Sequence, residues 1–199
     1  PFIGEWAQAP LPEAWRGEDY VSSHRIALSP EAMRCMRAAY WGLLNHVDDQ
    51  LRRLINPIKG INHGADTIII LTSDHGEAFG EHGMIRHGFE LWEPLVRVPF
   101  IVYVPGVASR RVMSRRSLVD LVPTILDLMQ TSAPSGEGSD FVSGQSLLPE
   151  LLGIEGGDQP RPLLVDMAQG PYNAERQAYY DGDYKLIASF GRPIGLYDL

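Results

Sequence analysis

The sequence predicts an α/β fold, with a mostly parallel sheet between helices and a small antiparallel hairpin region near the C-terminal end. Three observations support this: a long stretch with helical apolar periodicity, two continuous apolar runs rich in β-branched residues, and short strand candidates around a turn signal. The length of 199 residues fits a single domain. We place its main body at residues 1–165 and a hairpin appendage of the same domain at residues 166–199.

Residues 29–55 have the clearest helical pattern. Ser29 is a favourable N-cap, Pro30 fits the first helical position, and the pattern ends at Asn56-Pro57. Apolar residues recur at steps of three and four and define one face, which we expect to pack into the core. They are Met33, Met36, Tyr40, Leu43, Leu44, Val47, Leu51, Leu54 and Ile55.

The remaining elements are shorter. Residues 67–73 and 98–104 are apolar without alternation, which predicts strands covered on both faces, as in a parallel sheet. Residues 120–129 predict a short helix with Asp120 as its N-cap. Three further strand candidates lie near the C-terminal end, the first two around a hairpin signal at Asp181-Gly182-Asp183: residues 177–180, 184–188 and 194–197.

Composition excludes several classes of function. A net charge of −8 and a pI of about 5.2 disfavour binding to phosphate backbones and anionic lipid, so we expect neither nucleic acid nor membrane as partner. A bound metal ion could still reverse the sign of the charge locally and admit an anionic substrate. The single cysteine, Cys35, excludes an intrachain disulfide and a cysteine-based zinc site. The cellular compartment stays open.

The residues capable of chemistry are concentrated directly after the first apolar run. Ligands of open α/β sheets bind at the carboxyl ends of strands, where this segment is expected to lie. It contains three acids and three of the six histidines: Asp74, His75, Glu77, Glu81, His82 and His87. An adjacent Asp and His can coordinate a divalent cation, although further ligands are needed. Alternatively, Asp74 caps a turn and the histidines are polar loop residues, and Glu77 and Glu81 fit a solvated or loop-bracing role.

Several motifs resemble those of the sulfatase family of the alkaline phosphatase superfamily. Thr72-Ser-Asp-His-Gly-Glu77 is similar to the family's strand ending in Ser-Asp-His/Asn-Gly, and Gly80-Glu-His-Gly83 and Arg97-Val-Pro-Phe-Ile-Val102 are similar to the motifs that follow it. Three later stretches also resemble family motifs: Asp120-Leu-Val-Pro-Thr124, Gly144-Gln-Ser-Leu-Leu-Pro149 and Leu196-Tyr-Asp-Leu199. The resemblance covers nearly everything after residue 28 and implies an alkaline phosphatase-like α/β fold.

The resemblance also implies metal-dependent hydrolysis of a small anionic ester of sulfuric or phosphoric acid. By position, Asp74 and His75 would be two ligands of a divalent ion (Ca, Mg, Mn or Zn). His87 stands where the family has a Lys or His that contacts the sulfate or the leaving oxygen, so it is the catalytic candidate. Such a histidine can donate a proton to the departing oxygen or bind the ester oxygens. His82 is expected to brace the loop.

One family motif does not occur in this sequence: the nucleophile signature Cys/Ser-x-Pro-x-Arg. We therefore expect the C-terminal portion of a sulfatase-like domain, truncated on its N-terminal side, which contributes metal ligands and is inactive alone. Two alternatives stay open: a phosphodiesterase or phosphonate monoester hydrolase of the same superfamily, and a non-catalytic sulfatase-like binding module. A truncated sheet would expose strand edges, which allows self-association.

Overall fold

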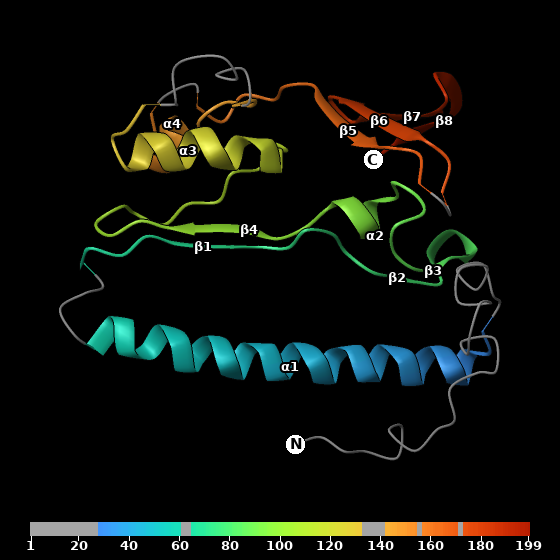
Figure 1. The fold of residues 1–199 in the computed structure, drawn as a ribbon, viewed down its shortest axis with the longest axis horizontal. Helices are drawn as coiled ribbons and strands as arrows, with labels where there is room; N and C mark the ends of the chain where they lie inside the picture. Colours follow the sequence, from blue (N-terminus) through green and yellow to red (C-terminus); the bar gives the residue numbers. More distant parts are fainter. Residues whose placement is uncertain (1–27, 61–64, 133–141, 155–156, 171–172) are drawn as a thin grey trace. The chain divides into compact units, whose positions relative to one another are not determined.

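The computed structural model describes residues 28–60, 65–132, 142–154, 157–170 and 173–199 (Figure 1). Contacts divide the chain into two compact units. One comprises the residues up to Pro105 together with Gln169–Ala174, and the other comprises Gly106–Ala168 and Glu175–Leu199. The division of the domain at residue 165 stays a prediction.

The first unit begins with a long helix, α1 (Pro30–Gly60). The Ser29 hydroxyl oxygen accepts a hydrogen bond from the backbone N–H of Ala32 at 3.1 Å, which confirms the predicted cap. The predicted end at Pro57 is wrong, because the helix continues through this proline to Gly60. A proline in the last turns removes only one hydrogen bond of the helical ladder. No helix within the described ranges has the length and apolar character needed to cross a bilayer.

The apolar face of α1 is covered only in part by other described residues. Near its start, the Tyr40 ring packs edge-on against Phe79, with the ring centroids 4.9 Å apart. Further along, Leu43, Val47 and Leu54 are 64%, 50% and 64% exposed. The prediction that the whole face packs into the core is therefore wrong for these positions in the described part of the chain. Periodicity identifies an apolar face but does not say what covers it.

The two apolar runs form β1 (Ile69–Thr72) and β4 (Phe100–Tyr103). They pair antiparallel, in a register that places Ile69 opposite Tyr103 and Thr72 opposite Phe100. The parallel sheet that we predicted from these runs is not found among the described strands, which pair antiparallel throughout. The predicted cover on both faces is wrong for β4, where Ile101 and Tyr103 are 58% and 46% exposed. An apolar run alone fixes neither the cover of a strand nor its direction, which depends on the connection between the strands. Self-association through the edges of this ladder stays a prediction.

The segment between β1 and β4 is compact despite its short elements. It contains β2 (Ala78–Phe79), a 3₁₀ turn η6 (Glu81–Gly83), β3 (Ile85–Arg86) and α2 (Glu93–Val96). A small core holds it together: Ala78, Met84 and Leu95 are buried, and Phe89, Trp92 and Val96 pack against them. This small core fixes the backbone from which the polar side chains of the segment extend.

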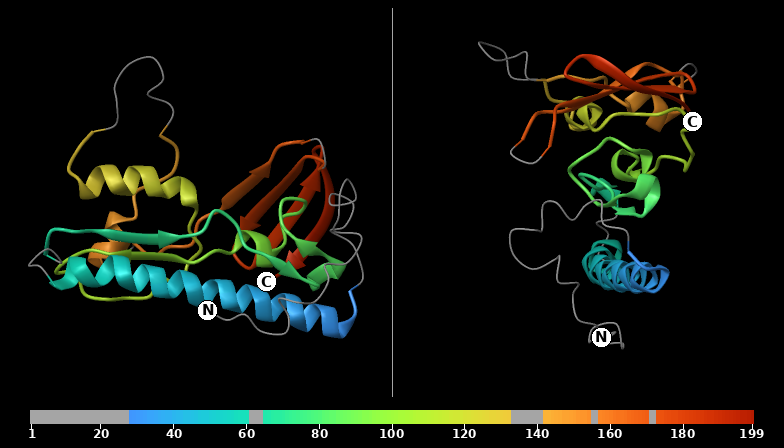
Figure 2. Two further views of the ribbon diagram at one scale, coloured as in Figure 1. Left: turned by 60° about the horizontal axis from the view of Figure 1, so that its bottom comes forward. Right: turned by 90° about the vertical axis from the view of Figure 1, so that its right-hand side faces the viewer.

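The second unit contains the C-terminal strands: β5 (Leu163–Met167), β6 (Arg176–Asp181), β7 (Tyr184–Ser189) and β8 (Arg192–Asp198). They form one antiparallel sheet in the order β5-β6-β7-β8 (Figure 2). The predicted hairpin is confirmed, because β6 and β7 pair directly across Gly182, which has a φ of +55°. The predicted last strand is confirmed as β8.

The second unit also contains η7 (Leu118–Asp120), α3 (Leu121–Leu128) and α4 (Leu148–Leu152). Asp120 stands at the N-cap position of α3, as predicted, but its side chain makes no capping hydrogen bond there. It takes part in the cap of η7 instead: Ser117 is the N-cap of η7, and the Asp120 carboxylate accepts a hydrogen bond from the backbone N–H of Ser117, as the third residue of a capping box does. The helical path begins one turn earlier than the apolar pattern indicates.

Candidate active site

Asp74 and His75 follow β1 in a tight turn held by short hydrogen bonds. The Thr72 hydroxyl donates to the carbonyl oxygen of Pro99 at 2.9 Å, which closes the end of the β1–β4 ladder. The Ser73 hydroxyl donates to the carbonyl oxygen of His75 at 2.7 Å. The backbone N–H of His75 donates to Asp74 Oδ1 at 3.0 Å. Local backbone contacts therefore fix both residues.

Gly76 docks this turn onto α2. Its backbone N–H donates to the carbonyl oxygen of Leu95 at 2.8 Å. A Cβ atom at this position would overlap the carbonyl oxygen of Pro94, which is backbone and cannot move aside as a side chain could. Only glycine fits this approach without displacing the turn, so the position of His75 depends on the residue that follows it.

The imidazole of His75 is anchored through one nitrogen. Nδ1 lies 2.9 Å from the carbonyl oxygen of Gly76. Because a carbonyl oxygen can only accept, Nδ1 carries the proton, and in the neutral ring Nε2 keeps its lone pair. Histidines that bind metals commonly donate their other ring N–H to a backbone carbonyl in this way.

The second nitrogen of His75 faces the neighbouring acid. Nε2 lies 3.7 Å from Asp74 Oδ2, and the side chains of His75 and Asp74 are 45% and 85% exposed. The hydrogen bond from the His75 backbone N–H, followed by the attraction of the His75 ring charge, lowers the pKa of Asp74 below its ordinary value of 3.8. The carboxylate is therefore ionised at neutral pH and reaches solvent.

This pair has the chemistry of half a metal site. Donor atoms that share one divalent ion at 2.0–2.6 Å lie roughly 3–4 Å apart, so a separation of 3.7 Å suits a common ion. A carboxylate oxygen and a neutral imidazole nitrogen together accept Mn²⁺ or Zn²⁺ as well as harder ions. In the described part of the chain, no group of three or more His, Cys, Asp or Glu side chains is arranged to hold a metal. The two residues fit a metal ion that receives its other ligands from elsewhere.

The third predicted site residue, His87, lies against this pair. Its ring stacks on that of His75, with centroids 4.0 Å apart and an interplanar angle of 24°. Its Nδ1 lies 2.8 Å from Glu77 Oε2. The structure thus brings Asp74, His75 and His87 together, although their roles as ligands and catalyst stay predictions.

The other acids and histidines of the segment make different contacts. The Glu81 carboxylate accepts a hydrogen bond from the backbone N–H of Phe79 at 2.5 Å and lies 3.5 Å from Nη2 of Arg37 on α1. The His82 ring stacks on Trp92, with centroids 3.9 Å apart. Both contacts fit the predicted loop-bracing role. Glu77 was not predicted to contact His87, because nothing in the sequence pairs residues ten positions apart across so short a hairpin.

Comparison with known proteins points to one family. A family model described as Sulfatase matches residues 5–131. An arylsulfatase of Clostridium perfringens is 32% identical over 152 residues, which are 74% of this chain and 30% of that protein. A choline-sulfatase of Rhizobium meliloti is 29% identical over 172 residues, 86% of this chain and 32% of that protein.

Solved structures agree at the level of the fold. A 2-O GAG sulfatase aligns with a TM-score of 0.73 at 22% identity over 97% of this chain and 42% of that chain. A protein solved in complex with its substrate D-glucosamine-2-N,6-O-disulfate aligns with a TM-score of 0.68 at 26% identity, over 98% of this chain and 37% of that chain. The chain spans about a third of the length of the curated relatives it matches. Since the family model covers more than half of the sequence, this chain belongs to the sulfatase family, and it shares the fold of solved sulfatases.

Proposed function

We propose that this chain supplies part of the active site of a metal-dependent sulfuric ester hydrolase, with Asp74 and His75 as ligands of a divalent ion and His87 as the residue that contacts the ester. The observation that carries the proposal is the grouping itself. An exposed ionised carboxylate lies 3.7 Å from an imidazole nitrogen, and a second imidazole stacks on the first at 4.0 Å. The proteins that this chain resembles are sulfatases, which supports a sulfate ester as the proposed substrate.

Each group has a definite chemical task in this proposal. A bound divalent ion would withdraw charge from the sulfate oxygens and lower the pKa of the attacking hydroxyl. Asp74 Oδ2 and His75 Nε2 would hold that ion at the end of β1. His87 would present Nε2 to the ester, because its Nδ1 is engaged by Glu77, and could bind an ester oxygen or protonate the departing alkoxide.

The nucleophile is the part that this sequence does not provide. No Cys/Ser-x-Pro-x-Arg motif occurs among the 199 residues, and we propose that the attacking hydroxyl comes from residues outside this chain. We therefore propose that the chain contributes ligands and a proton carrier and does not turn over sulfate esters by itself. The substrate class we propose is a sulfate ester; a similar protein binds a disulfated glucosamine as its substrate.

Paramagnetic Mn²⁺ tests the proposed metal ligands directly, even where binding is weak. In an NMR titration of the full chain, Mn²⁺ should broaden the signals of Asp74, His75 and His87 first. Asp74→Asn and His75→Ala should each raise the Mn²⁺ concentration needed by at least about 100-fold, because losing a ligand exceeds the 10- to 100-fold effect of losing an outer partner. Equal broadening in wild type and Asp74→Asn would refute the ligand assignment.

Asp66→Asn is the matched control for this titration. Asp66 is an exposed acid just before β1, and replacing it removes the same single charge without touching the turn. We expect its titration to match that of the wild type. If Asp66→Asn weakened Mn²⁺ binding as much as Asp74→Asn, the effect would reflect net charge, and the site would be lost as a proposal.

A turnover assay tests the second half of the proposal. With Mg²⁺, Ca²⁺, Mn²⁺ or Zn²⁺ added in turn, the purified chain should hydrolyse neither an aryl sulfate nor the matching aryl phosphate. Metal-dependent hydrolysis that disappears in Asp74→Asn would show that the chain contains its own nucleophile. A preference for the phosphate in that assay would also replace the sulfatase proposal by a phosphatase one.

A further inference from the structure

The contact between Glu77 and His87 places a specific constraint on the His87 ring. Glu77 Oε2 lies 2.8 Å from Nδ1 of His87, and the side chains are 21% and 43% exposed. An ionised carboxylate has no hydrogen to donate, so the hydrogen in this bond belongs to Nδ1. The neutral ring is then the Nδ1–H tautomer, with its lone pair on Nε2.

We infer that Glu77 is a positioning residue that fixes both the tautomer and the direction of the His87 ring. With Nδ1 engaged, any proton that His87 accepts or releases passes through Nε2. That Nε2 faces the ester rests on the proposed function, whereas the tautomer and ring direction follow from the geometry alone. Glu77 acts in this inference through His87, whose Nδ1 it contacts at 2.8 Å.

The local fold explains why these two residues meet. β2 and β3 pair antiparallel with Ala78 opposite Arg86, so residues 77 and 87 are the next pair along the two strands. Neighbouring residues fix the backbone of Glu77: Gly76 is hydrogen-bonded to Leu95, and Ala78 is 1% exposed in the small core. A carboxylate on so fixed a backbone can hold a ring in one direction.

One face of the His87 ring is occupied as well as its Nδ1 edge. It stacks on His75, whose own Nδ1–H is committed to the carbonyl oxygen of Gly76. Both rings are therefore anchored through Nδ1, and both keep Nε2 for other partners. The arrangement gives two neighbouring imidazoles the same tautomer by two different acceptors, a backbone carbonyl for His75 and the Glu77 carboxylate for His87.

Nitrogen NMR of the full chain measures this directly, because ¹⁵N shifts of the imidazole distinguish the two neutral tautomers. The spectrum is recorded well above the ordinary histidine pKa of about 6.5. We expect His87 in wild type to favour Nδ1–H by at least about tenfold, since hydrogen bonds to carboxylates are the stronger kind. In Glu77→Ala the ratio should fall below one, because free histidine side chains favour Nε2–H.

Glu81→Ala is the matched control, since it removes a carboxylate from the same loop that contacts Phe79 and Arg37. It should leave the His87 tautomer as in wild type. A wild-type His87 that is mainly Nε2–H overturns the inference without any variant, and an equal change in Glu81→Ala overturns it as well. Neither metal nor substrate enters the measurement, so a failed Mn²⁺ titration would remove the proposed function and leave this result standing.

Discussion

Two groups of acidic and basic side chains in this chain differ in how far their carboxylates are exposed to solvent. The Asp74 cluster (Asp74, His75, Glu77 and His87) lies in the first unit, and the Asp120 cluster (Asp120, Arg161, Glu150 and Arg116) lies in the second. The Asp74 side chain is 85% exposed, whereas that of Asp120 is 2% exposed. The comparison separates an acid that supports the fold from an acid that can meet a ligand.

Asp120 has no oxygen left for anything outside the protein. Its Oδ1 accepts from the backbone N–H of Gln145 at 2.9 Å, and its Oδ2 accepts from the backbone N–H of Ser117 at 3.0 Å. Arg161 also donates to Oδ2 through Nη2. Buried charges persist in proteins when they are paired and hydrogen-bonded in this way.

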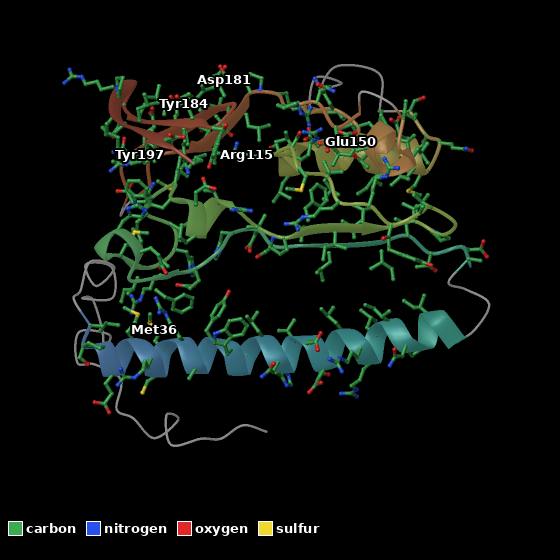
Figure 3. All side chains as sticks on the ribbon, turned by 180° about the vertical axis from the view of Figure 1, so that it is seen from behind. Met36, Arg115, Glu150, Asp181, Tyr184 and Tyr197 are labelled. Carbon is green, nitrogen blue, oxygen red and sulfur yellow. The ribbon has the colours of Figure 1, made fainter. Side chains whose placement is uncertain are left out.

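Arg116 and Glu150, also in the second unit, form a second buried and hydrogen-bonded pair. Arg116 Nε donates to Glu150 Oε1 at 2.8 Å, with the two side chains 8% and 9% exposed. Glu150, which lies on α4, is labelled in Figure 3. The remaining guanidinium nitrogens of Arg116 donate to the carbonyl oxygens of Arg115 and Gly157. In the Asp74 cluster, by contrast, His75 Nε2 and Asp74 Oδ2 lie 3.7 Å apart, too far for a hydrogen bond, and the Asp74 side chain is 85% exposed to solvent.

The largest change in stability that we predict comes from a substitution in the Asp120 cluster. Asp120→Ala should lower the free energy of unfolding by about 3 kcal/mol or more, because it leaves Arg161, whose side chain is only 20% exposed, without its partner. Within the described residues, the Nε atom of Arg161 has no hydrogen-bond partner either, so little else can compensate. Chemical denaturation measures the change.

Asp127→Ala is the control for that measurement, since Asp127 is an exposed acid on α3. It should change the free energy of unfolding by no more than about 0.5 kcal/mol. If Asp120→Ala cost as little as Asp127→Ala, the cluster would not be a source of stability, and the contrast between the two acids would fail.

A smaller loss of stability is expected at Gly76, where the turn that holds the Asp74 cluster contacts α2. Gly76→Ala should cost about 1–3 kcal/mol, because the added methyl group meets the backbone of Pro94 and must push the turn away. The same shift should alter the ring environment of His75, visible in its NMR signals. Gly60→Ala at the end of α1 is the control, because a Cβ there meets no atom within 4 Å. Equal stability of the two variants would show that the turn is not held by this contact.

A much smaller stability change is expected at the open acid itself. Asp74→Asn should alter the free energy of unfolding no more than Asp127→Ala does, since the side chain is largely solvated and Asn can still accept from the His75 backbone N–H. Denaturation of this variant beside Asp120→Ala compares the two acids in one experiment. A loss as large as that of Asp120→Ala would place Asp74 with the structural acids and weaken its assignment as a ligand.

The sequence indicates the residues of the Asp74 cluster more clearly than those of the Asp120 cluster. Asp74 and His75 stand out in the sequence because they directly follow an apolar run, and the structure places them side by side at the end of β1, while their role as ligands stays a prediction. Asp120 was predicted to be an N-cap, because the apolar pattern of α3 starts after it and shows nothing of the 3₁₀ turn that precedes the helix. Its partner Arg161 lies 41 residues away, beyond any local pattern.

Elements with local signals were predicted well, and long-range pairings were not. The start of α1 depends on Ser29 and Pro30, which act within one turn, and the β6–β7 hairpin depends on the turn residues between its strands. The direction of β1 relative to β4 depends on the path of the chain between Thr72 and Pro99, which are 27 positions apart, and no residue type encodes that path. The same limit explains why the partner of His87 was missed.

The last prediction concerns an acid between the two extremes. Asp158 accepts hydrogen bonds from the backbone N–H groups of Ser114 and Met113 and lies 3.7 Å from Arg116, yet its side chain is 43% exposed. Hydrogen bonding to Ser114, aided by the Arg116 charge, lowers the pKa of this carboxyl below 3.8. The stability it contributes is therefore complete above the unfolded-state pKa and is lost as the pH falls through the lower folded-state pKa.

A carboxyl-carbon NMR titration should accordingly give an inflection for Asp158 below 3.8. The difference in unfolding free energy between wild type and Asp158→Asn should shrink as the pH falls through that inflection, because both side chains are then neutral. An inflection at or above 3.8 would show that Ser114 and Arg116 do not favour the ionised form. Asp158 would then behave as a solvated acid despite its contacts, and hydrogen bonds alone, without burial, would not suffice to make an acid structural.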